Sequence, residues 1–179
     1  PKPSSAASDV YKRQAEARAI QAGGADFLLI GTNTMHKVAP EIEAAIDIPL
    51  LHIADATAHR LQADGVTRVG LLGTRFTMEQ DFYKGRLQER FGLEVLVPDD
   101  AARERVHRII YDELCLGDIR ESSQAEYLAI IADLAQTGAQ AVILGCTEIA
   151  LLVGACQAAV PLYDTTAIHA EAAVTLALA

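Results

Sequence analysis

The chain has 179 residues, of which 51% are hydrophobic and 5% aromatic, and its formal net charge is −9. A negative field of this size disfavours nucleic acid and anionic membrane surfaces, so neither is a predicted partner. The three cysteines, Cys115, Cys146 and Cys156, lack the spacing of a disulfide framework or a zinc site, so no metal is predicted and a reducing cytoplasm is the expected location.

The first stretch, residues 1–14, reads PKPSSAASDVYKRQ and lacks the apolar richness of the rest of the chain. It resembles a translated cloning adapter or a disordered tail, so it is predicted to be a leader outside the folded part. A helix over Asp9–Ala22, capped by Ser8, is the alternative. Because no methionine starts the chain, we expect a fragment that lacks its native beginning.

From there strands and helices alternate along the chain. Alternation of this kind predicts an α/β fold with parallel sheets and right-handed crossovers. The predicted strands cover Phe27–Ile30, Pro49–Ile53, Val66–Leu72, Glu94–Val97, Ala141–Leu144 and Val160–Tyr163. The predicted helices cover Lys37–Ala45, Asp55–Gln62, Met78–Phe91, Ala101–Leu114, a long segment from its cap Ser122 to Gln136, Glu148–Val153 and Thr166–Leu178.

One strand-and-loop element occurs twice. GADFLLIGTNT from Gly24 aligns without a gap with GAQAVILGCTE from Gly138, and an I-P-L or V-P-L strand follows each copy. Each of these is followed by an Asp and a His, Asp55 and His59 in the first copy and Asp164 and His169 in the second. Either match alone is common in α/β proteins, but both at nearly the same offset indicate a duplication.

The duplication predicts two Rossmann-like lobes related by a pseudo-two-fold axis. We assign residues 15–62 to a partial first lobe and 63–165 to the second. The last helix, 166–179, is expected to return to the first lobe. Only two strands fall in the first lobe, so its sheet is expected to be incomplete.

The two copies differ at the residue after the second glycine, which is Thr32 in one and Cys146 in the other. In open α/β sheets ligands bind beyond the carboxyl ends of the strands, where both residues are predicted. If two lobes face each other, Thr32 and Cys146 approach one small molecule from opposite sides. That arrangement suits removal of a proton from one face of a carbon and its return to the other face.

The motifs GTNTMH, LLGTRFTM, GCTEIALLV and DTTAIHA resemble those of the aspartate/glutamate racemase family. The resemblance implies two α/β lobes around a cleft, an acidic amino acid as substrate, no cofactor and a homodimer. Family members carry one catalytic cysteine in each lobe, so Thr32 departs from the pattern. They also begin with a glycine-rich strand that this chain lacks, which leads us to expect weak activity and aggregation.

The predicted catalytic residues are Cys146, Thr32 and His169. Cys146 is the expected base, with its pKa lowered by the helix after it; a small buried hydrophobe is the alternative. Thr32 is a far weaker acid and is expected to donate a hydrogen bond or relay a proton. His169 is implied by the family to assist Cys146, with its pKa raised by Asp164; a structural role at a helix end is the alternative.

The family implies that residues following each catalytic position hold the amino acid's carboxylate and amine. Thr34 could instead cap its helix, and Glu148 could be a capping or ion-pair carboxylate. An exposed lysine is usually solvated, yet an acidic protein that binds an anion needs local positive charge. The predicted substrate contacts are Asn33, Thr34, Thr147, Glu148, Arg75 and Lys37.

Other functions remain open at this stage. A single thiol also suits a decarboxylase or isomerase of the same superfamily, although the TNT motif favours an amino acid. An inactive fragment is a further alternative. A phosphate- or nucleotide-binding module is less favoured, because neither G-x-G-x-x-G nor G-x-x-x-x-G-K-[ST] occurs.

Overall fold

The computed structural model describes residues 5–154 and 156–179, and it is an α/β protein with two parallel sheets. The smaller sheet pairs β1 (Leu28–Leu29) with β2 (Leu50–Leu51). The larger sheet has the order β4-β3-β5-β6, and its strands are β3 (Arg68–Gly73), β4 (Glu94–Leu96), β5 (Ala141–Gly145) and β6 (Leu162–Asp164). The predicted α/β class with parallel sheets is confirmed.

The helices connect and cover these strands. In chain order they are α1 (Ser5–Ala22), the 3-10 helix η1 (Thr34–Val38), α2 (Ala39–Glu43), α3 (Ile53–Ala63), α4 (Arg75–Glu79), α5 (Lys84–Phe91), α6 (Asp100–Asp112), the 3-10 helix η2 (Leu114–Leu116), α7 (Glu121–Gln136), α8 (Ile149–Val153) and α9 (Thr165–Ala177). None of them, within the described ranges, is long and apolar enough to cross a membrane.

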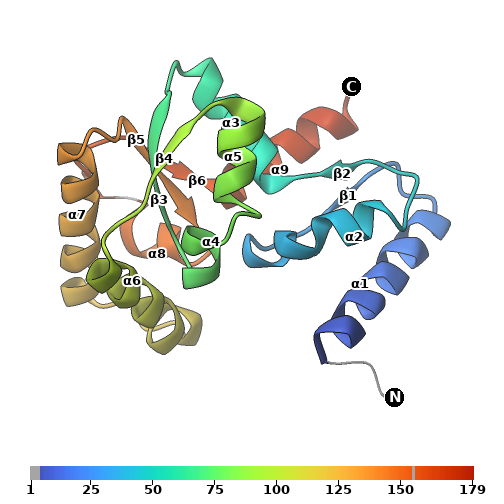
Figure 1. Ribbon diagram of the computed structural model, residues 1–179, viewed down its shortest axis with the longest axis horizontal. Helices are drawn as coiled ribbons and strands as arrows, with labels where there is room; N and C mark the ends of the chain where they lie inside the picture. The colour runs from blue at the N-terminus through green and yellow to red at the C-terminus, as the bar shows by residue number, and fades with distance from the viewer. Residues whose placement is uncertain (1–4, 155) are drawn as a thin grey trace.

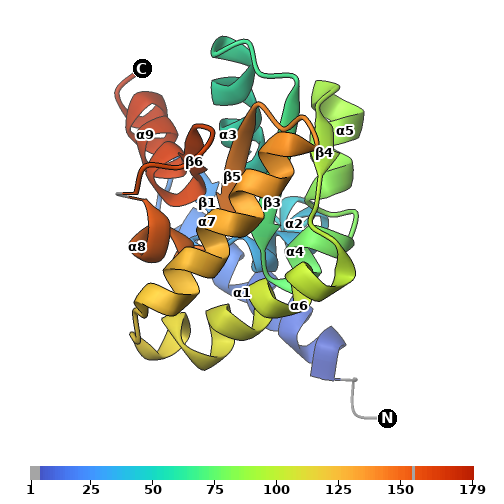
Figure 2. The same cartoon turned by 90° about the vertical axis from the view of Figure 1, so that its left-hand side faces the viewer.

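The larger sheet is covered on both faces, as its continuous apolar strands predict. Helices α3 and α5, together with Ile168 of α9, pack on one face, where Val69, Leu71 and Ile143 point. Helices α6, α7 and α8 pack on the other face against Leu72, Val142 and Leu144. Figure 2 shows α7 in front of the sheet, with α3 and α5 behind it. The smaller sheet lies to one side with α1 and α2 (Figure 1).

The internal repeat reappears in the strand register. Leu28 pairs with Leu50 in the smaller sheet, and the equivalent residues Val142 and Leu162 pair in the larger one. The same backbone hydrogen bond opens each pair: the Leu28 amide donates to the Pro49 carbonyl, and the Val142 amide to the Pro161 carbonyl, both at 2.9 Å. The helices after the second strands, α3 and α9, pack against each other.

The expected match of Asp55 and His59 with Asp164 and His169 is wrong. Asp164 caps α9, accepting from the Thr166 and Ala167 amides, whereas the equivalent cap of α3 is the His52 side chain. Asp55 lies one turn further along, where it pairs with Arg86 of α5. The repeat therefore extends to the strand pair and the helix, but not to these side chains.

Helix boundaries differ from the prediction in several places, of which three have a clear local cause or bear on a predicted cap. Pro40 lacks an amide proton, and the segment predicted as one helix from Lys37 is a 3-10 turn followed by α2, with Pro40 in its first turn. The helix predicted from Met78 is two helices, because the Thr74 side chain caps α4 at the Thr77 amide and α4 ends at Glu79. Helix α7 starts before Ser122, with Arg120 at its cap position.

The predicted leader and lobe boundaries stay predictions. Residues 5–14 belong to α1, with Ser8 inside it, and residues 1–4 lie outside the described residues. Ala17 of α1 is buried with Leu28 and Ile42. Helix α3, which the sequence assigned to the first lobe, contributes Ile53 and Leu61 to the core of the larger sheet.

Two glycines let β3 and β5 approach closely at their carboxyl ends. Gly73 pairs with Gly145, and a Cβ on Gly145 would lie 2.8 Å from the Leu72 carbonyl oxygen. A Cβ on Gly73 would lie 2.9 Å from the Gly145 carbonyl oxygen. Any larger residue would push these strand ends apart, so the glycines set the position of the loops that come after them.

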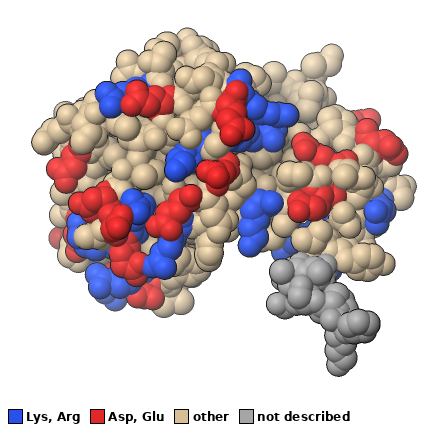
Figure 3. All heavy atoms as spheres, in the orientation of Figure 1, with Lys and Arg blue, Asp and Glu red and all other residues tan. Residues whose placement is uncertain are grey.

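Acidic and basic side chains alternate over the face of the molecule shown in Figure 3. Ion pairs between such side chains include Arg86 with Asp55 and Arg103 with Glu79. On this face the acidic side chains are mixed with basic ones rather than gathered in one acidic patch.

Candidate active site

A cavity of about 270 Å³ lies where the two sheets face each other. The loops after β1, β3 and β5 supply most of its wall. β3 and β5 belong to the larger sheet and β1 to the smaller one, so loops at the carboxyl ends of strands in both sheets line the same space. Helix α6 and the turn after it close the remaining side. The lining residues are Thr32, Asn33, Thr34, Met35, Thr74, Ile110, Tyr111, Cys115, Gly145, Cys146, Thr147 and Glu148.

Cys146 is partly buried and follows Gly145 at the end of β5. Its thiol donates a hydrogen bond of 2.9 Å to the Glu148 carboxylate. Burial raises the pKa of the Cys146 thiol, and this hydrogen bond and the carboxylate charge raise it further. The predicted lowering by a helix start is wrong, because α8 begins only at Ile149 and a carboxylate lies beside the sulfur.

The pKa of Glu148 is shifted in the opposite direction, downward. Burial alone would raise its pKa, but hydrogen bonds from Cys146, Thr147 and its own backbone lower the pKa overall. The stable arrangement is therefore a protonated thiol beside an ionised carboxylate. A proton can pass from sulfur to oxygen along this contact, which makes Glu148 the acceptor nearest to the thiol.

Asn33 is buried, with 2% of its surface exposed. Its amide nitrogen donates to the Thr165 hydroxyl at 2.9 Å, and that hydroxyl donates to the Leu144 carbonyl at 2.9 Å. Since the Thr165 proton is already used, the Asn33 amide must donate to this hydroxyl, which fixes its orientation. The Asn33 Oδ1 is then left without a partner among the described residues. It is a buried acceptor on a residue that lines the cavity, so it is available to a donor from a ligand.

The side-chain hydroxyls of Thr34, Thr74 and Thr77 form a cluster. Thr34 Oγ1 lies 3.1 Å from Thr74 Oγ1 and 3.5 Å from Thr77 Oγ1. The alternative in which Thr34 caps its helix is wrong, because Asn33 occupies the cap position of η1 and makes no side-chain cap bond. The hydroxyls of Thr34 and Thr74 can therefore turn toward a bound group.

Three predicted site residues do not line this cavity. His169 is buried and its Nε2 lies 2.8 Å from the Leu51 carbonyl oxygen. Burial lowers its pKa, so the predicted rise from Asp164 is wrong. Arg75 forms an ion pair with Glu104, and the Lys37 Nζ lies 5.8 Å from the centre of the Phe76 ring. The roles predicted for these residues at the substrate stay predictions.

The cavity also contains residues that motif analysis missed. Tyr111 and Ile110 come from the end of α6, and Cys115 from the turn after it. Cys115 is exposed. No motif marks these positions; only the packing of α6 over the ends of β3 and β5 brings them here.

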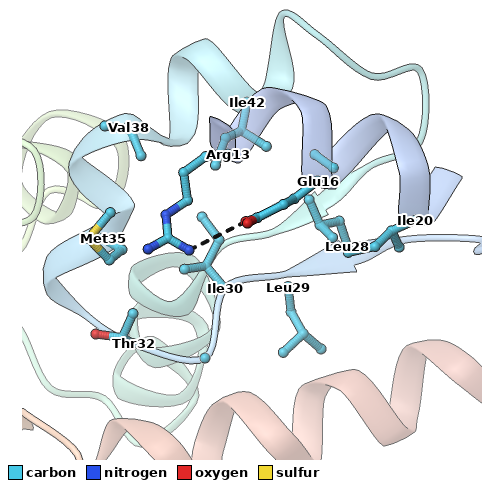
Figure 4. Close-up of a pocket in the computed structure, with 12 residues that line it drawn as sticks. Arg13, Glu16, Ile20, Leu28, Leu29, Ile30, Thr32, Met35, Val38 and Ile42 are labelled. Atoms are coloured by element: carbon cyan, nitrogen blue, oxygen red, sulfur yellow. Dashed lines mark ion pairs between the residues drawn. The ribbon is translucent and has the colours of Figure 1, made fainter. Parts of the chain in front are cut away.

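A second cavity, of about 290 Å³, lies between α1, β1 and α2 (Figure 4). Thr32 and Met35 line both cavities. The second is mostly apolar, and Arg13 and Glu16, one turn apart on α1, form an ion pair in its wall. It lacks Cys146 and Glu148, so the paired thiol and carboxylate belong to the first cavity alone.

A comparison with known protein families shows the family of this chain. The Asp/Glu/hydantoin racemase family matches residues 2–173. The chain belongs to this family. It is 26% identical over 160 residues to the broad specificity amino-acid racemase RacX of Bacillus subtilis, and the match covers 89% of this chain and 68% of RacX.

Two solved structures are similar to this chain over nearly its whole length. A candidate Asp/Glu racemase from Yersinia pestis is 54% identical, with a TM-score of 0.91 over 95% of this chain and 74% of that one. An aspartate racemase homologue from Pyrococcus horikoshii is 32% identical, with a TM-score of 0.88 over 99% of this chain and 78% of that one. The racemase fold and the isomerase class thus apply to this chain.

Proposed function

We propose that this racemase-family protein inverts Cα of an acidic amino acid, aspartate or glutamate, without a cofactor. The observation that supports this most directly is one cavity lined by both repeated loops. Thr32 stands at one strand end and Cys146 at the other, with the unpartnered Asn33 Oδ1 in the same wall. Two polar loops facing one small space suit a substrate that is attacked from two sides.

The polar groups match an amino acid. Its ammonium can donate to Asn33 Oδ1 and to the Glu148 carboxylate, which are both acceptors in the cavity wall. Its carboxylate can accept from the hydroxyls of Thr34, Thr74 and Thr147. No lysine occurs among the described lining residues, and a pyridoxal enzyme needs a lysine for its Schiff base. This composition supports the cofactor-free reaction.

The proposed proton transfers begin at the hydrogen bond between the Cys146 thiol and the Glu148 carboxylate. The Cys146 proton first passes to Glu148, because only the thiolate is an effective base. A substrate ammonium beside the sulfur favours that transfer by stabilising the thiolate. The thiolate then removes the Cα proton, and the opposite face takes a proton from the Thr32 hydroxyl or from a water that it orients. The proton held by Glu148 returns to that oxygen through solvent, which restores the starting state. The product is the other enantiomer.

Isotope exchange tests the proposal. The chain is incubated with L- and D-aspartate and L- and D-glutamate in D₂O, and the Cα–H signal is followed by NMR while chiral chromatography measures inversion. We expect loss of Cα–H together with formation of the opposite enantiomer. L-alanine and L-lysine, run in parallel, measure the preference for an acidic side chain. Exchange without any inversion, or no exchange of any amino acid, contradicts the proposal.

A single-thiol decarboxylase is the second candidate. The observation that favours it is Thr32, a poor base, where a second thiol would complete a racemase. Such an enzyme would release CO₂ from a substituted malonate, and Cys146 would protonate the resulting carbanion from one face. CO₂ release from phenylmalonate without amino-acid exchange would favour this alternative.

A further inference from the structure

Three buried histidines meet behind the cavity, outside its lining. His36 comes from η1, His52 caps α3 and His169 comes from α9. The ring centres of His36 and His52 are 4.3 Å apart, and those of His36 and His169 are 6.0 Å apart. Each ring also bonds to the backbone, so the cluster joins three separate segments of the chain.

The His36 ring connects the loop that contains Thr32 to the start of α3 at Ile53. Its Nδ1 lies 2.8 Å from the Thr32 carbonyl oxygen, and its Nε2 lies 3.2 Å from the Ile53 amide nitrogen. The Ile53 amide can only donate, so Nε2 must accept and the ring proton must be on Nδ1. That proton is donated to the Thr32 carbonyl. A single tautomer therefore satisfies both contacts.

The surroundings keep His36 neutral. Burial lowers its pKa to about 4, and His169 and Arg86 act in the same direction. A charged ring would place a proton on Nε2, facing the Ile53 amide proton, and both contacts could not persist. At neutral pH the ring is thus a fixed donor on one side and a fixed acceptor on the other.

These bonds connect the Thr32 loop to the larger sheet. Ile53 starts α3, whose Ile53 and Leu61 side chains pack in the core with β3 and β5. Cys146 follows β5 directly. His169 reinforces the same junction, with its Nε2 2.8 Å from the Leu51 carbonyl. The Thr32 carbonyl is therefore tied, through one imidazole, to the structural unit that carries the thiol.

We propose that His36 is a positioning residue that holds Thr32 in place across the cavity from Cys146. It does not line the cavity and does not touch the substrate. The inference rests on the proposed racemase function, in which Thr32 serves one face of Cα. Loss of the Thr32 contact should therefore affect that face more than the face served by Cys146.

Two amide substitutions separate the two contacts of His36. In His36→Asn the amide ends near the position of Nδ1, so it can still donate to the Thr32 carbonyl but cannot reach Ile53. In His36→Gln the amide ends near the position of Nε2, so it can accept from Ile53 but loses the Thr32 contact. His59→Gln is the matched control, because His59 is an exposed histidine of α3 that packs on Phe91.

The decisive readout is the ratio of Cα–H exchange rates of the two enantiomers in D₂O. We expect His36→Gln to slow exchange at the Thr32 face about tenfold relative to the Cys146 face, since small misplacements of a reacting group are costly. His36→Asn should leave the ratio within about twofold, and His59→Gln should not change it. Equal slowing of both faces in His36→Gln would mean a purely structural role and would overturn the proposal.

A measurement on the unaltered protein decides the geometry independently of activity. In protein labelled with ¹⁵N-histidine, long-range ¹H–¹⁵N spectra distinguish the protonated ring nitrogen. We expect one neutral ring, absent from His36→Asn, that carries its proton on Nδ1 at pH 7. The Thr32 and Asn33 amide signals should shift more in His36→Gln than in His36→Asn.

The two experiments keep the two proposals apart. A protein that exchanges neither enantiomer contradicts the racemase function, while the spectra still test whether His36 holds Thr32. A His36 ring protonated on Nε2, or equal shifts of the Thr32 amide in both variants, overturns the positioning role whatever the activity.

Discussion

The two walls of the cavity are equivalent in sequence but differ in how they are held. Cys146 follows a five-residue strand in the middle of the larger sheet, and every residue of that strand is buried. Thr32 follows a two-residue strand in which Leu29 is 42% exposed. The thiol wall is supported by dense packing on both faces, whereas the threonine wall depends on a few long-range hydrogen bonds.

Their side-chain chemistry differs as well. The Cys146 thiol has its proton acceptor, Glu148, two residues away in the same loop. The Thr32 hydroxyl makes no hydrogen bond to the described residues, and its backbone carbonyl is held instead by His36. The Cys146 loop, here called the rigid wall, thus carries a thiol that becomes a base once its proton passes to Glu148. The Thr32 loop, here called the tethered wall, carries a weak acid. The comparison predicts unequal proton transfer at the two faces of the substrate.

Removing the thiol should have the largest effect. In Cys146→Ala, exchange of both enantiomers should fall by about 10²-fold or more, the scale of a lost acid–base group. Initial rates of Cα–H loss in D₂O measure it. Cys156→Ala, a change in another partly buried cysteine, is the control and should keep the rate. Near-normal exchange in Cys146→Ala would show that the thiol wall is not the reactive one.

The asymmetry of the walls should give the next largest effect. The resemblance to the family implies that the second-lobe cysteine serves the L enantiomer. We therefore expect D-aspartate or D-glutamate to lose Cα–H about tenfold more slowly, roughly 1.4 kcal/mol of barrier. Thr32→Cys should narrow this gap by placing a thiol on the tethered wall. Thr34→Cys tests whether the position matters. Equal rates for both enantiomers in the parent would contradict the assignment of Thr32.

Much of this comparison could be predicted from the sequence, because it depends on local pattern. Apolar runs predicted the buried strands, and the repeat around Gly24 and Gly138 anticipated equivalent registers at Leu28 and Val142. Ligands bind beyond the carboxyl ends of such strands, and two lobes that face each other bring the two polar loops to one space. Thr32 and Cys146 therefore line one cavity, as predicted.

The sequence could not specify side-chain surroundings that come from distant segments. The pKa of Cys146 rises because of burial and the rotamer of Glu148, neither of which a motif specifies. Arg75 turns toward Glu104, 29 residues away, and His169 turns toward the β2 end. Cys115 enters the cavity only through the packing of α6. Motif spacing places the backbone, whereas long-range partners decide where each side chain points.

The thiol–carboxylate contact gives a further test of the rigid wall. In Glu148→Gln the negative charge beside the sulfur is removed, so the pKa of Cys146 should fall and more thiolate should be present at a given pH. Alkylation of Cys146 by iodoacetamide at pH 8 should then become about tenfold faster, judged from the usual effect of a neighbouring charge. The measurement uses a background with Cys115→Ser and Cys156→Ser.

The matched control for that test is Glu171→Gln, which removes a carboxylate of α9 that pairs with Arg60 of α3. It should leave the alkylation rate unchanged. The proton acceptor is also lost in Glu148→Gln, so amino-acid exchange should slow even though the free thiol reacts faster. A slower alkylation would mean that Glu148 stabilises the thiolate rather than the thiol.

The smallest expected effect concerns the bond that joins the two walls. Asn33 follows the tethered strand, and Thr165, its hydrogen-bond partner, follows β6 of the larger sheet. Thr165→Val keeps the shape of the side chain but leaves the Asn33 amide nitrogen without an acceptor. Asn33 Oδ1 should then lose its fixed orientation, and KM for the amino acid should rise about fivefold, the equivalent of one hydrogen bond of about 1 kcal/mol.

We expect kcat to change less, since Asn33 binds the ammonium and takes no part in proton transfer. Thr175→Val, on the exposed side of the same helix, is the control and should leave KM unchanged. A fall in kcat with KM unchanged would show that the bond positions the Thr32 wall for chemistry instead of orienting an acceptor for the substrate.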